Sequence, residues 1–348
     1  MRDSTQKSLS KIKTGFFCSP IGLGHATRDV AIAEYLEKSD IRFITGSGAA
    51  KLILEYGFAV NDEYSPPNFD VQNGALQASL KWLWRYYQYY KDCKRISQKF
   101  IETQKPDLIV SDEDFASLTI AQEKKIPSIL ITDILETGFT KGIGSIIEKK
   151  MNKSMKEIIQ KCNVVIMPED GADQDNIKRV GPIVRPISQT REELRKKFSF
   201  EKKTIVASIG GTDAGKFLIE KTIHSVSKLN QDLDLVIVSG PSLKIENKNI
   251  RNLGFVNNLH EIIYASDLVI SLAGKSTIDE SKAYGTPGIF IPIKGHFEQE
   301  DNAKSEGYSF DDVFKLESLI PQKLESKRMQ VKTDGAKKAA EIILQHIP

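Results

Sequence analysis

The chain has 348 residues, enough for two domains of ordinary size, and 40% of them are hydrophobic, which supplies a substantial core. Its 49 basic and 46 acidic residues leave a net charge of only +3, which argues against a dedicated nucleic-acid-binding protein. Cys18, Cys93 and Cys162 are far apart, which fits a reducing cytosol rather than a disulfide framework and gives no zinc-ligand spacing. No apolar run approaches the ~20 residues of a membrane span.

Residues 1–13 are polar and basic and lack the apolar run of a signal peptide, so we expect a short flexible tail there. Beyond it, short apolar runs alternate with helical patterns, which predicts an α/β protein built on parallel sheets with crossover helices. The runs expected to form strands lie at 14–18, 41–45, 107–111, 128–132 and 164–167 in the first half and at 204–209, 233–239, 252–255, 268–271 and 288–291 in the second.

The segment GPIVRP at 181–186 contains two prolines and a glycine, which cannot continue a helix, so the sequence predicts an interdomain linker there. This linker divides the chain into an N-terminal domain at 14–183 and a C-terminal domain at 184–330. A final amphipathic helix within 331–348 can pack back on the first domain. Two doubly wound domains place a cleft between the carboxyl ends of two sheets, where ligands of open α/β sheets bind.

A glycine-rich loop at 19–29 (SPIGLGHATRD) follows the first expected strand and opens a helix. Gly22 and Gly24 suggest a dinucleotide fingerprint, but Thr27 stands at its third glycine position and no ribose-binding acid ends the second strand, so NAD binding is disfavoured. The glycines instead let the backbone approach a donor closely. They place His25 at the helix start, where the dipole favours a neutral imidazole suited to general-base chemistry. A capping or structural histidine is the alternative.

Carboxylates follow two of the expected strands. Asp112 comes directly after the run at 107–111, so it can reach the cleft and hydrogen-bond His25. The alternative interpretation is a solvated acidic loop. Asp114 and Asp133 are rival carboxylates for the same role.

An unusual aromatic segment lies at 81–95 (KWLWRYYQYYKDCKR). It holds both tryptophans, four of the ten tyrosines and five basic residues. Aromatic side chains beside lysine and arginine suit a membrane interface, a lipid-linked acceptor or sugar stacking. Helical spacing also puts Trp82, Tyr86 and Tyr89 or Tyr90 on one face, so a helix with an aromatic core face is an equally good interpretation.

A second glycine-rich loop lies at 208–216 (SIGGTDAGK). Gly210 and Gly211 expose backbone N–H groups and Thr212 can donate its hydroxyl, which suits a phosphate site. Most of a P-loop is also present, but Phe217 stands where a magnesium-binding serine or threonine is required, so a nucleoside triphosphatase is disfavoured.

The segment at 271–292 (SLAGKSTIDESKAYGTPGIFIP) is the most informative part of the chain. An expected strand ends at Gly274, and Ser276 and Thr277 open a helix, so free N–H groups and the positive end of the helix dipole form an anion site. Glu280, one turn into the helix, can accept hydrogen bonds from a ribose diol.

Polar residues follow the next expected strand. His296 is a plausible sugar contact, and Gln299 and Asn302 add amide groups beside it. A polar loop without a ligand is the alternative interpretation here. His260, which lies in a different loop, fits a structural or exposed role better than a catalytic one.

The segment at 271–292 and the glycine–histidine loop together resemble the nucleotide-sugar-binding sequences of GT-B glycosyltransferases, especially the MurG-like and UDP-glycosyltransferase families. The resemblance covers most of residues 14–310 and is more specific in the second half than in the first. It implies a GT-B fold, in which two Rossmann-like domains face a central cleft. The N-terminal domain would bind the acceptor and the C-terminal domain the nucleotide-sugar donor.

The resemblance also implies roles for individual residues. His25 would deprotonate the acceptor hydroxyl while Asp112 orients it. The loop that contains Gly210, Gly211 and Thr212 would lie against the donor diphosphate.

Further donor contacts follow from the same resemblance. Arg185 resembles the arginine that neutralises phosphate after an Asn-Pro-Val stretch in MurG-like linkers, although this chain has Gly-Pro-Ile-Val there. The backbone around Val256 would face the nucleobase. Gln299 and Asn302 match best the segment of the family that touches the donor sugar and ribose, and His296 lies in the same segment of this chain.

The expected activity is transfer of a hexosyl or N-acetylhexosaminyl group from a nucleotide-diphosphate donor, UDP above all, to a hydroxyl acceptor. The resemblance implies inversion at the sugar carbon without a metal or cofactor. A lipid-linked acceptor, and a cytoplasmic enzyme in peripheral contact with the inner membrane face, are compatible with the aromatic segment. The alternatives are an epimerase or hydrolase of the same fold and a non-catalytic nucleotide-sugar-binding subunit.

Overall fold

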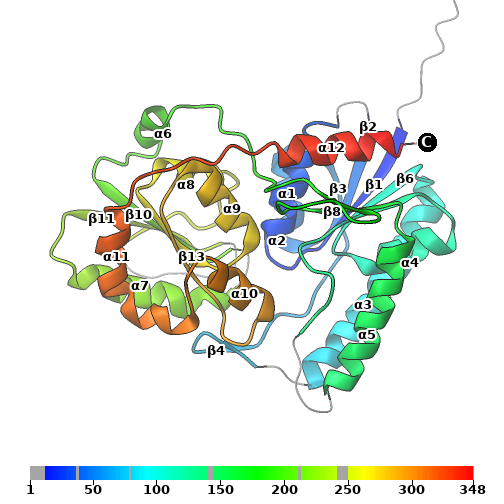
Figure 1. Ribbon diagram of the computed structural model, residues 1–348, viewed down its shortest axis with the longest axis horizontal. Helices are drawn as coiled ribbons and strands as arrows, with labels where there is room; N and C mark the ends of the chain where they lie inside the picture. Colours follow the sequence, from blue (N-terminus) through cyan, green and yellow to red (C-terminus); the bar gives the residue numbers. More distant parts are fainter. Residues whose placement is uncertain are drawn as a thin grey trace, which may run out of the picture.

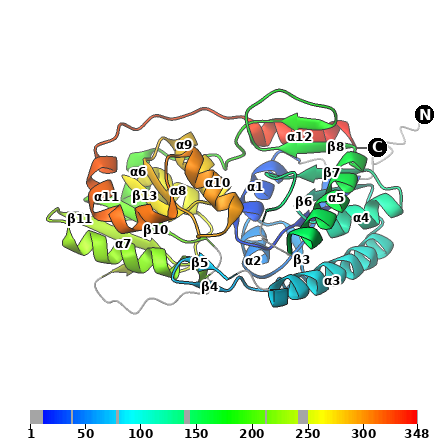
Figure 2. The ribbon, with the colours of Figure 1, turned by 60° about the horizontal axis from the view of Figure 1, so that its bottom comes forward.

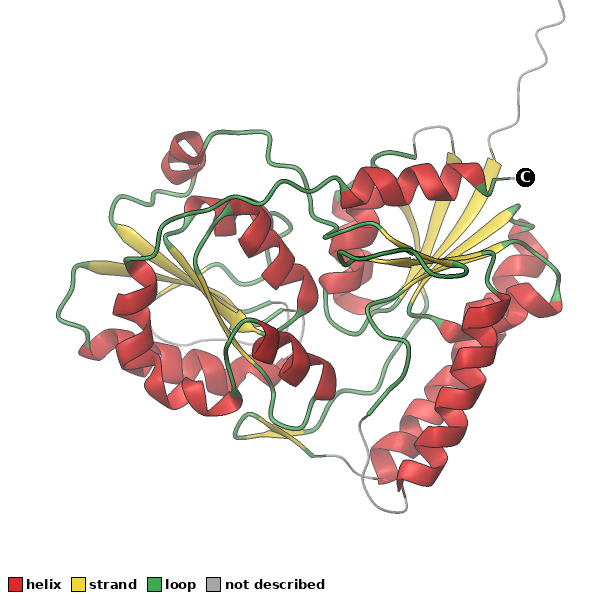
Figure 3. Ribbon diagram, viewed as in Figure 1, coloured by secondary structure: helices red, strands yellow, loops and turns green. Residues whose placement is uncertain are grey.

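The computed structural model describes residues 12–36, 39–77, 80–138, 144–210, 213–240 and 250–347. Two parallel sheets lie beside each other, and each is flanked by helices (Figures 1 and 3). This is the α/β arrangement that the alternating pattern predicts.

The N-terminal sheet has seven strands in the order β3-β2-β1-β6-β7-β8-β9, all parallel. Their bounds are β1 (Ile12–Cys18), β2 (Ser39–Thr45), β3 (Ala59–Asp62), β6 (Leu108–Asp112), β7 (Ser128–Ile131), β8 (Val164–Met167) and β9 (Ile177–Arg179). The five strands expected in this half are confirmed. The edge strands β3 and β9 were not expected, because their half-exposed residues form no continuous apolar run.

The C-terminal sheet has the order β12-β11-β10-β13-β14 and is also parallel. Its strands are β10 (Lys203–Ser208), β11 (Leu233–Val238), β12 (Arg251–Asn252), β13 (Leu268–Leu272) and β14 (Gly288–Ile291). The strand expected over 252–255 is wrong in extent. Pairing ends at Asn252 because Gly254 turns the chain out of the sheet at a φ of +62°.

Helices fill the crossover connections and both sheet faces. They are α1 (Gly24–Ala33), α2 (Ser47–Glu55), α3 (Leu80–Gln104), α4 (Phe115–Glu123), α5 (Gly144–Lys161), α6 (Arg191–Lys197), α7 (Lys216–Lys228), α8 (Leu259–Ala265), α9 (Lys275–Tyr284), α10 (Phe297–Ser305), α11 (Leu316–Leu324) and α12 (Gly335–Gln345). Two short 3₁₀ turns and a hairpin of β4 (Val71–Gln72) and β5 (Ala75–Leu76) complete the elements. In the part of the chain that is described, no helix combines the length and apolarity that crossing a bilayer requires.

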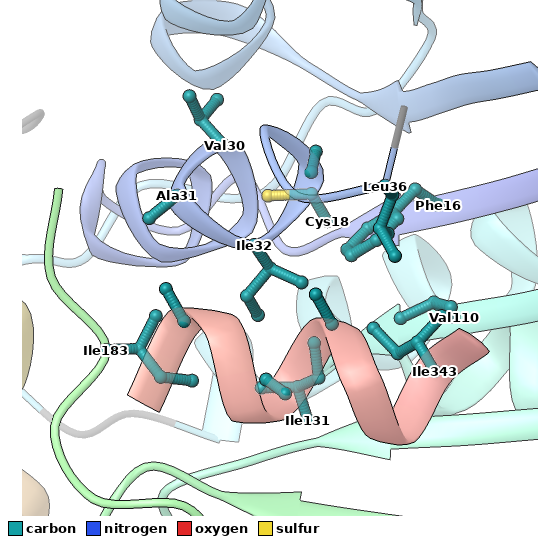
Figure 4. Close-up of a cluster of buried hydrophobic side chains, with 14 of the residues drawn as sticks. Phe16, Cys18, Val30, Ala31, Ile32, Leu36, Val110, Ile131, Ile183 and Ile343 are labelled. Atoms are coloured by element: carbon teal, nitrogen blue, oxygen red, sulfur yellow. The ribbon is translucent and has the colours of Figure 1, made fainter. Parts of the chain in front are cut away.

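The last helix, α12, lies over the N-terminal sheet although the chain has by then completed the second domain (Figure 1). Ala336, Ala339, Ala340 and Ile343 form a buried stripe at helical spacing. Figure 4 shows Ile343 among the side chains of this core, and the residues around it come from β1, α1 and β6. The two domains are therefore joined by a second chain crossing in addition to the linker at 181–186.

Candidate active site

A cavity of about 970 Å³ lies between the two domains, at the carboxyl ends of both sheets. The loops after β1, β6 and β7 line one side, and the loops after β10, β13 and β14 line the other. This is where the crossover topology collects loop residues that are far apart in the sequence.

His25 and Asp112 meet on the N-terminal side of this cavity. His25 Nδ1 lies 2.9 Å from Asp112 Oδ1, across 87 residues of sequence. Parallel pairing of β1 with β6 sets this contact, because Cys18 stands opposite Asp112 and each strand ends there. Asp112 is fully buried behind the histidine, while His25 keeps part of its ring on the cavity wall.

Arg28 fixes the orientation of Asp112. Its Nε and Nη2 atoms donate to the two carboxylate oxygens at 2.5 Å each, and its Nη1 donates to Asp133. Arg28 is three residues after His25 on α1, so both side chains project from one face of the helix. The spacing of Arg28 from His25 is visible in the sequence, but no motif there predicts the role of Arg28.

The expectation of a neutral His25 is wrong. Burial disfavours the charged ring, but the carboxylates of Asp112 and Glu113 outweigh it and raise the pKa of His25 to about 9. Glu113 Oε2 lies 3.8 Å from Nε2. Two nearby carboxylates exceed the half charge of a helix N-terminus, so they favour the protonated ring in the free protein.

The rival carboxylates have separate partners. Asp114 caps α4 by accepting from the backbone N–H groups of Ala116 and Ser117, and it also accepts from the Tyr64 hydroxyl at 2.7 Å. Asp133 is paired with Arg28. Asp112 is therefore the carboxylate among these three that contacts His25.

Glu298 approaches this group from the C-terminal domain, at the first turn of α10. Burial, followed by the charges of Glu113 and Asp133, raises its pKa to about 8. The sequence motifs do not predict a role for Glu298, because its charged neighbours come from the other domain.

The N-terminus of α9 forms part of the opposite wall. Gly274 is the N-cap, and Gly274, Ser276 and Thr277 all line the cavity. The Ser276 hydroxyl donates to the Gly24 carbonyl at 3.0 Å, and a side chain at Gly24 would stand 3.0 Å from that hydroxyl. A side chain at position 24 would therefore crowd Ser276 where the two helix starts approach each other.

Arg185 and Glu280 form a buried ion pair. The expectation that the Arg185 guanidinium is free to bind a diphosphate is therefore wrong. Arg185 Nε and Nη2 lie 2.8 and 3.2 Å from the two Glu280 oxygens. Nη1 donates to the Asn257 carbonyl at 2.8 Å and to the Tyr56 hydroxyl. Both members of the pair are buried and line the cavity wall. Arg185 therefore holds Glu280 in place.

The remaining expected residues fall into four groups. Cavity-lining residues are Gly22, Gly210, Val256, His296 and Gln299. Gln299 uses its side-chain oxygen to accept from the Ile293 N–H, and Asn302 donates to the Ala273 carbonyl, so both brace the loops. Gly211 and Thr212 lie outside the described residues. His260 is buried away from the cavity, and desolvation lowers its pKa to about 2, in agreement with a structural role.

The cavity continues between α3 and α5. Its walls there carry Trp82, Tyr86, Tyr89 and Tyr90 from α3 and Met151, Met155 and Ile158 from α5. Trp84 and Tyr87 also line this cavity, and they stay 61% and 50% exposed. Within the described residues, no group of three or more His, Cys, Asp or Glu side chains could hold a metal ion.

Comparison with known proteins agrees with this architecture. The glycosyltransferase family 28 C-terminal domain matches residues 205–341. An uncharacterized glycosyltransferase of Methanosarcina acetivorans is 28% identical over 84% of this chain and 83% of its own length. The UDP-N-acetylglucosamine–N-acetylmuramyl-(pentapeptide) pyrophosphoryl-undecaprenol N-acetylglucosamine transferase of Staphylococcus saprophyticus is 23% identical over 76% of this chain and 75% of its own.

Among solved structures, the glycotransferase of kitacinnamycin superposes with a TM-score of 0.67 at 13% identity, covering 97% of this chain and 99% of that one. The fold is that of GT-B glycosyltransferases, as the sequence resemblance implied, and the similar sequences make glycosyltransferase the enzyme class. Residues 205–341 are similar to the family 28 C-terminal domain, and the similar proteins include MurG-like transferases.

Proposed function

We propose that this glycosyltransferase moves a sugar from a nucleotide-diphosphate donor, UDP-linked by preference, to a hydroxyl group of an acceptor, with inversion and without a bound metal. One observation carries the proposal: His25, backed by Asp112, faces the same cavity as the N-terminus of α9. A base and an anion site on opposite walls are the two features that such a transfer requires.

The chemistry follows from these positions. With Nδ1–H donating to Asp112, the Nε2 atom of His25 accepts the proton of the acceptor hydroxyl as its oxygen attacks the anomeric carbon. The bond from that carbon to the diphosphate oxygen breaks, and a single displacement inverts the centre. Negative charge on the departing diphosphate is stabilised by the dipole of α9 and by the N–H groups of its first turn, at residues 275–277.

Glu280 is proposed to bind the donor ribose. Each of its oxygens accepts one guanidinium N–H from Arg185, so a further lone pair on each remains for a diol. Arg185 is then a positioning residue that pairs with the buried carboxylate and orients it. The two residues form one unit in which the arginine does not contact phosphate.

A nucleotide panel tests the donor site. UDP-, GDP-, CDP- and TDP-sugars are compared by thermal shift, and a donor at 100 times its dissociation constant stabilises the protein by about 2.7 kcal/mol. Release of nucleoside diphosphate that requires an added hydroxyl acceptor supports transfer. Release without an acceptor, or interconversion of the sugar, supports a hydrolase or an epimerase instead. Binding without turnover of any kind supports a non-catalytic subunit.

The acceptor is proposed to be lipid-linked and presented at a membrane surface. The apolar cavity branch between α3 and α5 supports this, as do Trp84, Tyr87 and the 60% exposed Ile146 at the outer ends of these helices. Basic side chains, including Arg85 and Lys150, flank them. The relative from Staphylococcus is named for an undecaprenol acceptor.

Flotation with anionic vesicles tests the membrane proposal. Binding at low salt that falls as salt rises is expected, with each basic residue near the surface adding about 1 kcal/mol. Trp84→Ser with Arg85→Ser should reduce flotation. Trp82 is left intact, since its ring stacks on Phe69 and Tyr86. A protein that stays at the bottom of the gradient at low salt contradicts the proposal.

A further inference from the structure

A strap formed by residues 65–77 crosses from the N-terminal domain to the C-terminal domain. Its first end is fixed at Tyr64, whose buried hydroxyl donates to Asp114. Its far end is the β4–β5 hairpin, which lies beside α7 of the C-terminal domain in Figure 2, although α3 of the N-terminal domain follows it in the chain.

The hairpin is docked by backbone hydrogen bonds and by a close glycine contact. Leu76 N–H donates to the Lys294 carbonyl at 2.8 Å, and Lys294 N–H donates to the Gly74 carbonyl at 2.9 Å. Gly74 has a φ of +76°, and a Cβ there would stand 2.8 Å from the rings of both Phe217 and Phe310. Only glycine satisfies both the backbone angle and the packing at this position.

The strap carries Phe69 into the cavity wall. Phe69 stacks on Trp82 of α3, with ring centroids 5.3 Å apart, and meets the ring of His296 edge-on at 5.6 Å. Trp82 in turn stacks on Tyr86 at 5.2 Å. An aromatic wall therefore runs from the loop after β14 in the C-terminal domain to α3 in the N-terminal domain, and all four residues line the cavity that holds His25.

We propose that Phe69, positioned by docking of the strap on the C-terminal domain, determines how tightly the acceptor is held against Trp82. The aromatic wall lines the same cavity as His25. It would therefore contact the ring or chain of the acceptor that lies next to the reacting hydroxyl. The N-terminal domain forms most of the acceptor-binding wall, but the strap that carries Phe69 is docked on the C-terminal domain. Acceptor binding then depends on how the two domains are arranged. The inference rests on the proposed function, which makes a glycoside with an apolar tail a suitable probe.

The test uses Gly74→Ala, with Gly57→Ala as the matched control. Gly57 has a similar φ of +84°, but no atom lies within 4 Å of the position that an added methyl group would take, so the control carries the same backbone strain without the clash. Both are made in a Trp84→Phe background, which leaves Trp82 as the one tryptophan of the chain. Tryptophan emission then reports the Phe69–Trp82 stack.

Gly74→Ala should shift the emission to longer wavelength and weaken binding of octyl β-glucoside about threefold to tenfold relative to the control. Affinity for the nucleoside diphosphate selected by the donor panel should change by less than about twofold, since that site lies on the other wall. Unchanged emission and glucoside binding, or an equal loss of nucleotide affinity, would overturn the inference.

Phe69→Leu is the second variant, in case Gly74→Ala fails to fold. It removes the stacking face and leaves the strap backbone unchanged, so glucoside binding should fall while nucleotide affinity stays. Glucoside binding equal to that of the parent would overturn the inference. These readouts measure binding and emission rather than turnover, so they remain decisive even if sugar transfer itself is disproved.

Discussion

The two walls of the cleft recognise their ligands by different means. The C-terminal wall presents backbone groups at the start of α9, together with one buried pair, Arg185 and Glu280. The N-terminal wall presents a side-chain network, in which Arg28 links Asp112 to Asp133 and His25 completes the group. A backbone site depends on local sequence, whereas a charge network depends on which strand ends are neighbours.

Replacement of His25 tests the N-terminal wall most severely. His25→Ala should reduce kcat by about 10²–10⁴-fold, because it removes the proposed base, and should leave nucleotide affinity in calorimetry nearly unchanged. His224→Ala, an exposed histidine on α7, serves as the control. Full turnover by His25→Ala would move the base to another residue, with Glu113 and Asp133 the next to examine.

Arg28→Met should cost both stability and activity. Its removal leaves two carboxylates without their buried cation, and the free energy of unfolding should fall by about 3–5 kcal/mol in urea titration. Lys338→Met breaks an exposed ion pair with Asp334 and should change stability little. Equal effects of the two substitutions would show that the network around Arg28 contributes no more than a surface pair.

Glu280→Gln tests the C-terminal wall. The amide keeps the shape of the side chain but loses the charge that strengthens hydrogen bonds, so nucleotide binding should weaken by about 1.5–3 kcal/mol in calorimetry. Glu317→Gln, on the exposed surface of α11, is the control. Nucleotide affinity that matches the control would remove Glu280 from the donor site.

The pH dependence sharpens the contrast between the walls. The proposed base acts deprotonated, and Asp112 and Glu113 raise the pKa of His25 to about 9, so kcat/KM should rise about tenfold per pH unit from pH 7 toward that value. Glu113→Gln removes one of the two carboxylates and should move the inflection to lower pH. A rate that is already flat above pH 7 in the parent enzyme would contradict the raised pKa.

Much of the framework could be predicted from the sequence, because it is specified locally. Buried parallel strands appear as short apolar runs, and glycines with hydroxyl residues mark the start of α9. The edge strands β3 and β9 could not be found, because half-exposed strands leave no such run. The prediction of a longer β12 was wrong because Gly254 adopts a left-handed conformation. Nothing in the sequence around Gly254 indicates this conformation.

The residues that form the site could be predicted better than their pairings and pKa values. The sequence by itself determined that His25, Asp112 and Glu280 would lie at strand ends and helix starts, since loop position follows from the order of strands and helices. Only the tertiary structure decided that Arg185 binds Glu280 across 95 residues, that Arg28 holds Asp112 across 84, and that the strap carries Phe69 to Trp82. These contacts depend on strand order, burial and domain packing, so the pKa of His25 could not be inferred from its neighbours in the chain.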